Sequence, residues 1–232
     1  MIEPLFEDRQ LLVALKPPNL LSQGDATGDP DLLGLLKEMI RVRDHKPGNV
    51  YLGLVHRLDR PVGGLMVFAK TSKAAARLSA QLREHAIGRE YLCVVTGEVP
   101  DRLDLTDYLL KDEQTRMVRV VPPDRKGAQK AVLHAVCVAR RGDTSLLAVT
   151  LETGRSHQIR VQLAHAGAPL WGDQRYGKSD GLRQIALWGY RLTVEHPISH
   201  ERMQWISLPE GGIWSAYAQD MAAFAKKQEE NP

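Results

Sequence analysis

Hydrophobic and polar positions change their spacing repeatedly along this chain, and the changes predict mainly strands. Short apolar or alternating runs are typical of strands, because successive side chains of a strand point to opposite faces of a sheet. The first such run, Leu11–Lys16, is stopped by Pro17 and Pro18. Further strands are predicted at Val50–Val55, Gly63–Ala69, Arg89–Val99, Ala131–Ala139, Ser145–Glu152, Gln184–Glu195 and Met203–Leu208.

Apolar residues spaced three or four apart predict helices between these strands. In the first helix Asp29 is the expected N-cap and Pro30 the first helical residue, with Leu32, Leu33, Leu36 and Ile40 at helical spacing. Three more helices are expected: one capped by Ser72, with Ala75, Leu78 and Leu82 on one face, one over Ser156–Ala166 that ends near Gly167, and one over Trp214–Lys226 before a fraying tail at Lys227–Pro232.

The order of these elements predicts an α+β fold, since strands and helices do not alternate as they do in a doubly wound sheet. The chain has 232 residues, of which 43% are hydrophobic and 25% charged, as in ordinary globular proteins. No repeat, low-complexity tract or linker divides the sequence. We therefore expect a single domain over residues 1–232.

Charge and cysteine content limit the partners and the cellular compartment that we expect for the protein. The net charge of +3 permits a polyanionic partner without requiring one. The N-terminus has no signal-peptide pattern, and no stretch approaches the roughly 18 apolar residues of a membrane span. Cys93 and Cys137 lie in alternating apolar stretches, where buried, reduced thiols are expected. These features predict a cytoplasmic protein that is not bound to a membrane.

Two distant residues, Asp59 and Arg160, carry the candidate chemistry. Asp59 precedes a proline corner, and alone it would be an ordinary turn aspartate. However, Arg57 lies two residues before it, and Gly63-Gly64 allows backbone to approach a ligand closely. Arg160 lies among apolar neighbours, so we expect a partly buried guanidinium that binds a carboxylate. The hypothesis is an aspartate kept ionised by an arginine.

Several segments, in the right order, carry a resemblance to one known family. Segment 56–59 (HRLD), with Gly64 five residues later, is similar to its catalytic-loop motif, and segment 89–91 (REY) to its tyrosine strand. Segment 153–160 (TGRSHQIR) is similar to its arginine motif, 169–177 (PLWGDQRYG) to the segment that follows, and 11–17 to its opening strand. By these motifs the chain resembles the RluA-type RNA pseudouridine synthases. The resemblance implies a mixed, largely antiparallel sheet with flanking helices and a central active-site cleft.

The resemblance also implies an activity: isomerisation of uridine to pseudouridine in structured rRNA or tRNA, by base flipping, glycosidic bond cleavage and rejoining of C5 to C1′, without cofactor or metal. Asp59 is then the catalytic carboxylate, which attacks C1′ or removes a proton from C2′. Arg160 is its salt-bridge partner. Tyr91 stacks on the uracil, although its sequence position alone indicates ordinary strand packing. A monomer is expected.

Four residues are candidates for RNA binding and base flipping under the same resemblance. Arg57 would fill the gap that the flipped nucleotide leaves. His56, Arg155 and His157 belong to the same two motifs, and the histidines are interpreted as hydrogen-bonding residues that orient the loops.

The chain departs from the family pattern in three ways. Val62-Gly63 stand where many members have Thr-Ser, and Leu15 stands where Asn is frequent. There is no room for a separate S4-type RNA-binding domain before Leu11, so target recognition is expected from the catalytic domain itself. A basic cluster then either contacts phosphates or is a solvated β surface, with equal weight: Arg116, Arg119, Arg125, Lys126 and Lys130.

Rival interpretations remain. Segment 172–179 (GDQRYGKS) formally matches a phosphate-binding loop, but no buried strand precedes it and Asp180-Gly181 is a poor helix start. A non-catalytic RNA-binding protein on the same scaffold is the second alternative. A metal site is the third, but Pro197 separates His196 from His200 and no nearby Cys or acidic cluster completes a site.

Overall fold

The computed structural model describes residues 2–177 and 184–230. Contacts divide the chain into two compact units, each with its own strands and helices. Unit 1 comprises Met1–Arg89 and Gly189–Ser207, and unit 2 comprises Glu90–Trp188 and Leu208–Pro232. Both units combine antiparallel strand pairs with helices, so the predicted α+β class is confirmed.

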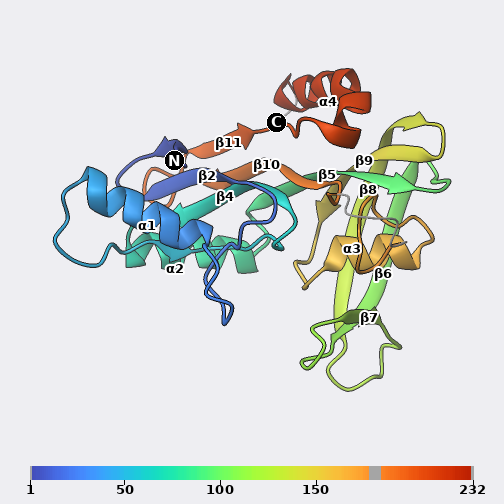
Figure 1. Ribbon diagram of the computed structural model, residues 1–232, viewed down its shortest axis with the longest axis horizontal. Helices are drawn as coiled ribbons and strands as arrows, with labels where there is room; N and C mark the ends of the chain where they lie inside the picture. Colours follow the sequence, from blue (N-terminus) through green and yellow to red (C-terminus); the bar gives the residue numbers. More distant parts are fainter. Residues whose placement is uncertain (1, 178–183, 231–232) are drawn as a thin grey trace. The chain divides into compact units, whose positions relative to one another are not determined.

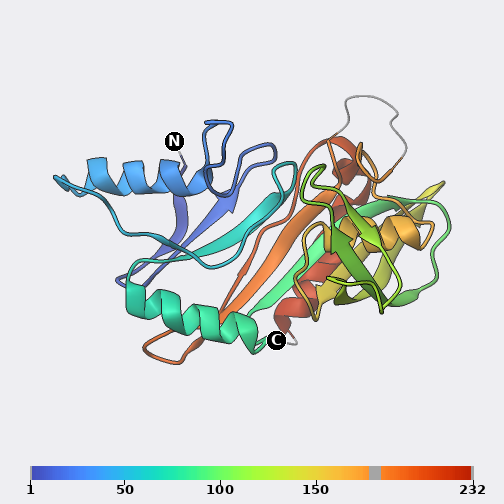
Figure 2. The same cartoon turned by 90° about the horizontal axis from the view of Figure 1, so that it is seen from below.

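Unit 1 is built on strands in the order β1-β2-β4-β10, with β3 added to β4 and β11 added to β10. Figure 2 shows β1, β2, β4 and β10 side by side, with α1 and α2 running close to them. The bounds of these elements are β1 Pro4–Glu7, β2 Leu11–Lys16, α1 Leu32–Arg43, β3 Gly53–Leu54, β4 Gly63–Ala69, α2 Ser72–Arg83, β10 Leu187–Glu195 and β11 Arg202–Ile206.

The core of unit 1 explains why β4 is apolar throughout. All seven residues of β4 are buried, because β2 and β10 flank it and side chains pack on it. Val67 packs with Leu192 of β10 and with Leu78 of α2 in one cluster. Gly64 has φ +136, and a Cβ there would lie 2.4 Å from the backbone nitrogen of Gly189. Only glycine permits this approach, which fixes the start of β4 against β10.

Unit 2 is an antiparallel sheet in the order β5-β9-β8-β6-β7. Figure 1 shows α3 beside β6 and β7, and Val161 of α3 joins a core cluster with Leu109 of β6 and Val118 of β7. The bounds are β5 Gly88–Thr96, β6 Arg102–Lys111, β7 Val118–Val120, β8 Gln129–Arg141, β9 Thr144–Leu151, α3 Gln158–His165, a 3-10 helix Gly212–Tyr217 and α4 Ala218–Glu230.

Two predicted helix caps were wrong by one or two residues. The N-cap of α1 is Asp31, whose carboxylate accepts a hydrogen bond from the Gly34 amide at 2.9 Å. The N-cap of α2 is Thr71, whose hydroxyl accepts one from the Ala74 amide at 3.1 Å. In both helices another residue suited to capping lies within two positions of the predicted one. The residue that forms the cap is the one three positions before the amide that it binds.

Other boundaries moved where local pattern and tertiary pairing disagree. The predicted strand Val50–Val55 contains only the two residues of β3, because pairing with β4 stops at Leu54. Strands β1, β6 and β7 were missed: β1 has only four residues, and exposed polar residues weaken the apolar signal of β6 and β7. The last helix is split into a 3-10 turn and α4, which continues through residues where fraying was predicted. Cys93 is buried as predicted, whereas Cys137 is only half-buried.

Candidate functional site

The loop that carries Asp59 lies between β3 and β4 in unit 1, and it is held at several points. The hydroxyl of Ser22 accepts a hydrogen bond from the Leu58 amide at 3.1 Å and donates one to the Leu58 carbonyl at 2.7 Å. The amide of Val62 donates to the Asp59 carbonyl at 3.0 Å. Asp59 itself is half-buried between the buried Leu58 and the exposed Arg60. The backbone of the loop is therefore fixed on both sides of the carboxylate.

Lys16 is a further anchor of this loop, and no functional role was predicted for it from the sequence. Its ammonium is fully buried and donates to the carbonyls of Pro17 at 3.1 Å, Leu20 at 2.6 Å and Arg60 at 3.0 Å. Burial lowers the pKa of Lys16 to about 8, although the negative charge of Asp59 raises it in part. A lysine at the end of a buried apolar strand was the signal, because an amine is buried only where acceptors meet it.

His56 fixes the start of the loop. It is buried, and its Nε2 accepts a hydrogen bond from the Val67 amide of β4 at 3.3 Å. Burial, together with the positive charge of Arg89, lowers the pKa of His56 to about 3, so the imidazole is neutral. His56 thus ties the loop to β4 through its ring, and its role in orienting the loop for RNA stays a prediction. Arg57, next to it, is exposed.

Replacing Lys16 with methionine is expected to lower kcat at least tenfold, because three carbonyl groups lose their donor and the Asp59 loop loosens. The matched control is Lys70→Met. Lys70 lies at the end of the neighbouring strand and binds Glu7 and the Asp8 carbonyl, away from the loop. Both variants should lower the melting temperature, but only Lys16→Met should lower kcat. Equal losses of kcat in the two variants would contradict this role.

The depressed pKa of Lys16 also has a consequence for stability. Between pH 8 and 10.5 the unfolded state binds the lysine proton and the folded state has released it. The free energy of unfolding therefore gains a contribution that rises with pH through this window. Denaturant titrations of wild type and Lys16→Met across pH 7 to 10.5 should show this rise only in wild type. Parallel curves for the two proteins would exclude it.

In unit 2, the guanidinium of Arg160 makes a bidentate ion pair with Asp173. Nε and Nη2 donate to the two carboxylate oxygens, both at 2.8 Å, and the two side chains are 7% and 1% exposed. Burial alone would raise the pKa of Asp173, but the hydrogen bonds and charge of Arg160 outweigh it and leave the pKa lowered. The predicted bidentate carboxylate partner thus exists within unit 2. The pairing of Arg160 with Asp59, which lies in unit 1, stays a prediction.

Tyr176 links this ion pair to its surroundings, and the sequence did not single it out. Its ring lies 5.2 Å from the guanidinium carbon of Arg160. Its hydroxyl accepts a hydrogen bond from the Val118 amide at 3.0 Å and lies 2.7 Å from Nδ1 of His157. Tyr176 and Asp173 both belong to segment 169–177, whose resemblance was noted without roles for either residue. Together they fix the orientation of the arginine on α3.

The turn before α3 is locked by Gln158. Its side-chain oxygen accepts hydrogen bonds from the Thr153 hydroxyl at 2.8 Å and the Arg155 amide at 2.9 Å, and its nitrogen donates to the Val132 carbonyl at 3.0 Å. His157 has φ +53, so α3 begins at Gln158 and not at Ser156 as predicted. Arg155 is exposed and donates through Nε to the Lys130 carbonyl at 3.0 Å.

The sequence-predicted site residues thus fall into two groups. His56, Arg57 and Asp59 share one loop of unit 1. Tyr91, Arg155, His157 and Arg160 belong to unit 2, where Tyr91 is buried in β5 opposite Val149.

The rival sites gain no support from the described residues. Lys178 and Ser179 of the phosphate-loop pattern lie outside them. Among residues 2–177 and 184–230, no group of three or more His, Cys, Asp or Glu side chains is placed to hold a metal ion. Within the same ranges, no helix has both the length and the apolar composition to cross a membrane.

Comparisons with known proteins agree with the motifs. The family model described as RNA pseudouridylate synthase matches residues 10–165. Ribosomal large subunit pseudouridine synthase D of Pseudomonas aeruginosa is 34% identical over 242 residues, which cover 96% of this chain and 74% of that protein. Ribosomal large subunit pseudouridine synthase C of Buchnera aphidicola is 35% identical over 177 residues, covering 76% of this chain and 54% of that protein. The chain thus spans between about half and three quarters of these relatives.

Solved structures show the same fold. The structure titled Human RNA Pseudouridylate Synthase Domain Containing 4 superposes with a TM-score of 0.75 at 19% identity, covering 94% of this chain and 92% of that one. Human RNA Pseudouridylate Synthase Domain Containing 1 gives 0.71 at 20% identity, with 94% and 87% covered. At this identity the likeness concerns the fold alone. With the family match over well more than half its length, the chain belongs to the RNA pseudouridylate synthase family, in the RluA-type group that its motifs predicted.

Proposed function

We propose that the protein isomerises uridine to pseudouridine in RNA, with large-subunit ribosomal RNA as its substrate. Family membership supports the reaction, and the relatives named ribosomal large subunit pseudouridine synthases support the choice of RNA. Transfer RNA remains the alternative substrate. The reaction needs no group beyond the side chains and the RNA itself.

The observation that carries the proposal is the anchoring of the Asp59 loop. Three buried side chains, Lys16, Ser22 and His56, hold its backbone on both sides of the carboxylate. A turn aspartate needs no such support. A catalytic carboxylate does, because positioning within a fraction of an ångström decides the rate.

The proposed chemistry uses the carboxylate of Asp59. Asp59 attacks C1′ of the target uridine or removes the C2′ proton, and in both routes the bond from C1′ to N1 breaks. The detached uracil rotates and C5 bonds to C1′; in the first route this breaks the bond between Asp59 and C1′, and in the second Asp59 returns the proton to C2′. C5 then loses its proton and N1 takes one up, so the product is an isomer of the substrate. Because C1′ and C5 are hidden in stacked RNA, the nucleotide must be flipped out, at a cost of a few kcal/mol.

Other residues then have defined roles. Tyr91 offers an aromatic face on which the extruded uracil stacks. Arg57, exposed two residues before Asp59, fills the space that the nucleotide leaves. Arg160 supports the charge of Asp59.

The direct test uses an unmodified large-subunit ribosomal RNA transcript and, separately, a pool of unmodified transfer RNA transcripts. After incubation with the protein, pseudouridine is mapped at nucleotide resolution. The proposal expects pseudouridine at one or a few defined uridines of the ribosomal transcript. Modification of transfer RNA alone would correct the substrate. RNA binding without any pseudouridine in either pool would favour a non-catalytic RNA-binding protein.

A further inference from the structure

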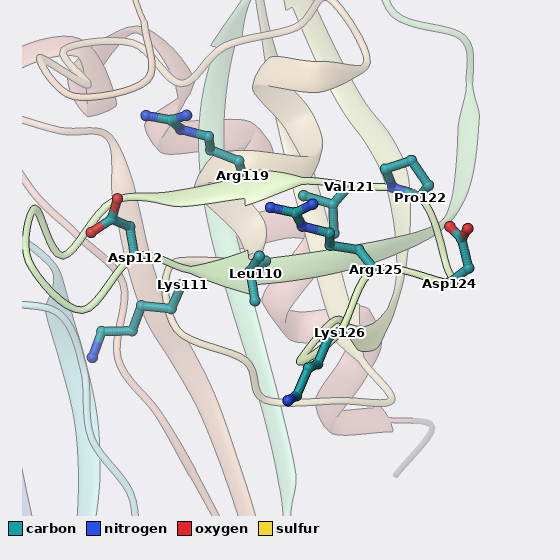
Figure 3. Close-up of a pocket in the computed structure, with 9 residues that line it drawn as sticks. All are labelled: Leu110, Lys111, Asp112, Arg119, Val121, Pro122, Asp124, Arg125 and Lys126. Atoms are coloured by element: carbon teal, nitrogen blue, oxygen red, sulfur yellow. The ribbon is translucent and has the colours of Figure 1, made fainter.

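In unit 2, the end of β6, strand β7 and the loop that follows β7 line a cationic hollow. None of its residues has a role in the proposed mechanism. The hollow has a volume of about 770 Å³, within the range of about 300–1,000 Å³ that is typical of ligand sites. Its lining combines three apolar side chains, four cations and two acids (Figure 3): Leu110, Val121, Pro122, Lys111, Arg119, Arg125, Lys126, Asp112 and Asp124.

The local backbone explains why the cations gather here. In the ladder, Arg119 pairs with Leu110, and its neighbours Val118 and Val120 point inward, so its side chain is exposed. The loop after β7 then folds back over Leu110. The amide of Val121 donates to the Tyr108 carbonyl at 2.9 Å, and a Cβ at Gly127 would lie 3.2 Å from Leu110. This turn carries Arg125 and Lys126 to the rim of the hollow (Figure 3).

Of the four cations, Arg119 interacts electrostatically with Asp112 of the same hollow. Within the described residues, no hydrogen bond or ion pair involves the side chains of Arg119, Arg125 or Lys126, whereas Lys111 is paired with Glu113 at 2.9 Å. The Asp112 carboxylate accepts hydrogen bonds from the amides of Gln114 and Thr115, so it serves the turn between β6 and β7. Arg119, Arg125 and Lys126 therefore offer N–H donors to an external anion, which a guanidinium binds well through its fork of donors.

A second hollow of about 270 Å³ continues the surface toward the arginine motif. It shares Leu110 and Lys111 with the first and is lined at its far side by Arg155 and Ser156. Arg155 is held in place by its Nε, which donates to the carbonyl of Lys130, another exposed cation. Cations therefore occur from the β6–β7 end to the segment that precedes Arg160, together with the acids Asp112, Asp124 and Glu113.

The geometry points to this surface as a binding site for the sugar-phosphate backbone of the substrate RNA, away from the reacting uridine. We call it the hairpin groove, defined by Arg119, Arg125 and Lys126 over the apolar floor of Leu110, Val121 and Pro122. The cations contact phosphates, and the floor takes the apolar face of a ribose or base. This inference rests on the proposed function, because it names where that RNA is held. An acidic protein segment, the alternative ligand, would bind the cations but would have no use for the apolar floor.

The test is a triple variant, Arg119→Gln, Arg125→Gln and Lys126→Gln, in the full chain. The probe is the unmodified large-subunit ribosomal RNA transcript, and its Kd is measured by filter binding over a series of salt concentrations. Each lost phosphate contact should make the slope of log K against log salt shallower by about 0.7–0.9, so the triple variant should lose roughly 2–3. Kd at 0.1 M salt should rise on the order of tenfold or more. In turnover, the loss should appear in KM, with kcat kept at saturating RNA.

The matched control removes the same charges elsewhere: Arg9→Gln, Arg202→Gln and Lys226→Gln, all exposed. It should keep the wild-type Kd and salt slope. A triple variant that keeps the wild-type slope and KM while wild type forms pseudouridine would overturn the groove and leave the proposed function standing. If the triple variant binds RNA more weakly but neither it nor wild type forms pseudouridine, the groove stands and the proposed function is overturned. Displacement of the RNA by poly-glutamate at equal charge concentration would assign the groove to an acidic protein segment.

Discussion

Asp59→Asn is expected to abolish pseudouridine formation while the protein stays folded and still binds RNA. The amide keeps the shape of the side chain, but it neither attacks C1′ nor accepts the C2′ proton, so the rate should fall by roughly 10²–10⁴-fold or more. The loop backbone should stay in place, because Lys16, Ser22 and His56 hold it through main-chain groups and not through the carboxylate. The measurement is pseudouridine by nucleoside mass spectrometry under single-turnover conditions.

The matched control is Asp29→Asn. Asp29 pairs with Arg60 at 2.7 Å on the exposed side of the same loop, so the control removes an equal charge from the immediate surroundings. An exposed pair is worth less than about 1 kcal/mol, and activity should survive. If Asp59→Asn retains substantial pseudouridine formation, the assignment of the catalytic carboxylate is wrong. If both variants lose activity, the loop requires its charges for folding or RNA entry and the test has located a structural effect.

Arg160→Met is expected to have the second largest effect, and it acts on stability as well as activity. It leaves the Asp173 carboxylate buried without its bidentate partner, which typically costs about 3–5 kcal/mol of the free energy of unfolding. Asp173→Asn leaves the Arg160 guanidinium buried without its charged partner. The oxygen of the new asparagine still accepts hydrogen bonds from the amides of Arg175 and Tyr176. The double variant removes both charges, so its loss of stability should be smaller than the sum of the single losses.

The activity of the double variant separates two roles of Arg160. If the arginine also supports Asp59, the double variant should regain stability in denaturant titrations yet form no pseudouridine. If activity returns together with stability, Arg160 serves only to neutralise Asp173, and the predicted support of Asp59 by Arg160 is wrong. Tyr176→Phe is a useful companion, because it keeps the ring beside Arg160 and removes only the hydroxyl between Val118 and His157.

Local pattern predicted the buried elements well and the half-exposed ones poorly. Strands β2 and β4 were found at their observed bounds, because runs of apolar residues such as Leu11–Lys16 have few other uses. Strand β6 was missed, since residues 102–107 alternate exposed and half-buried side chains and the strand contains four acids or bases: Arg102, Asp104, Asp107 and Lys111. Such a strand is stable only because β8 pairs with it along most of its length.

The sequence by itself determined the family, the fold class and the candidate catalytic residues, because motifs such as HRLD and TGRSHQIR constrain chemistry through residue type and order. Only the tertiary structure decided which groups surround these residues. Lys16 meets the Arg60 carbonyl 44 positions away, Ser22 meets Leu58, and Arg160 meets Asp173 within unit 2. A buried charge needs a partner, but its position along the chain gives no hint of which partner the fold brings near, since that follows from how strands and loops pack in space.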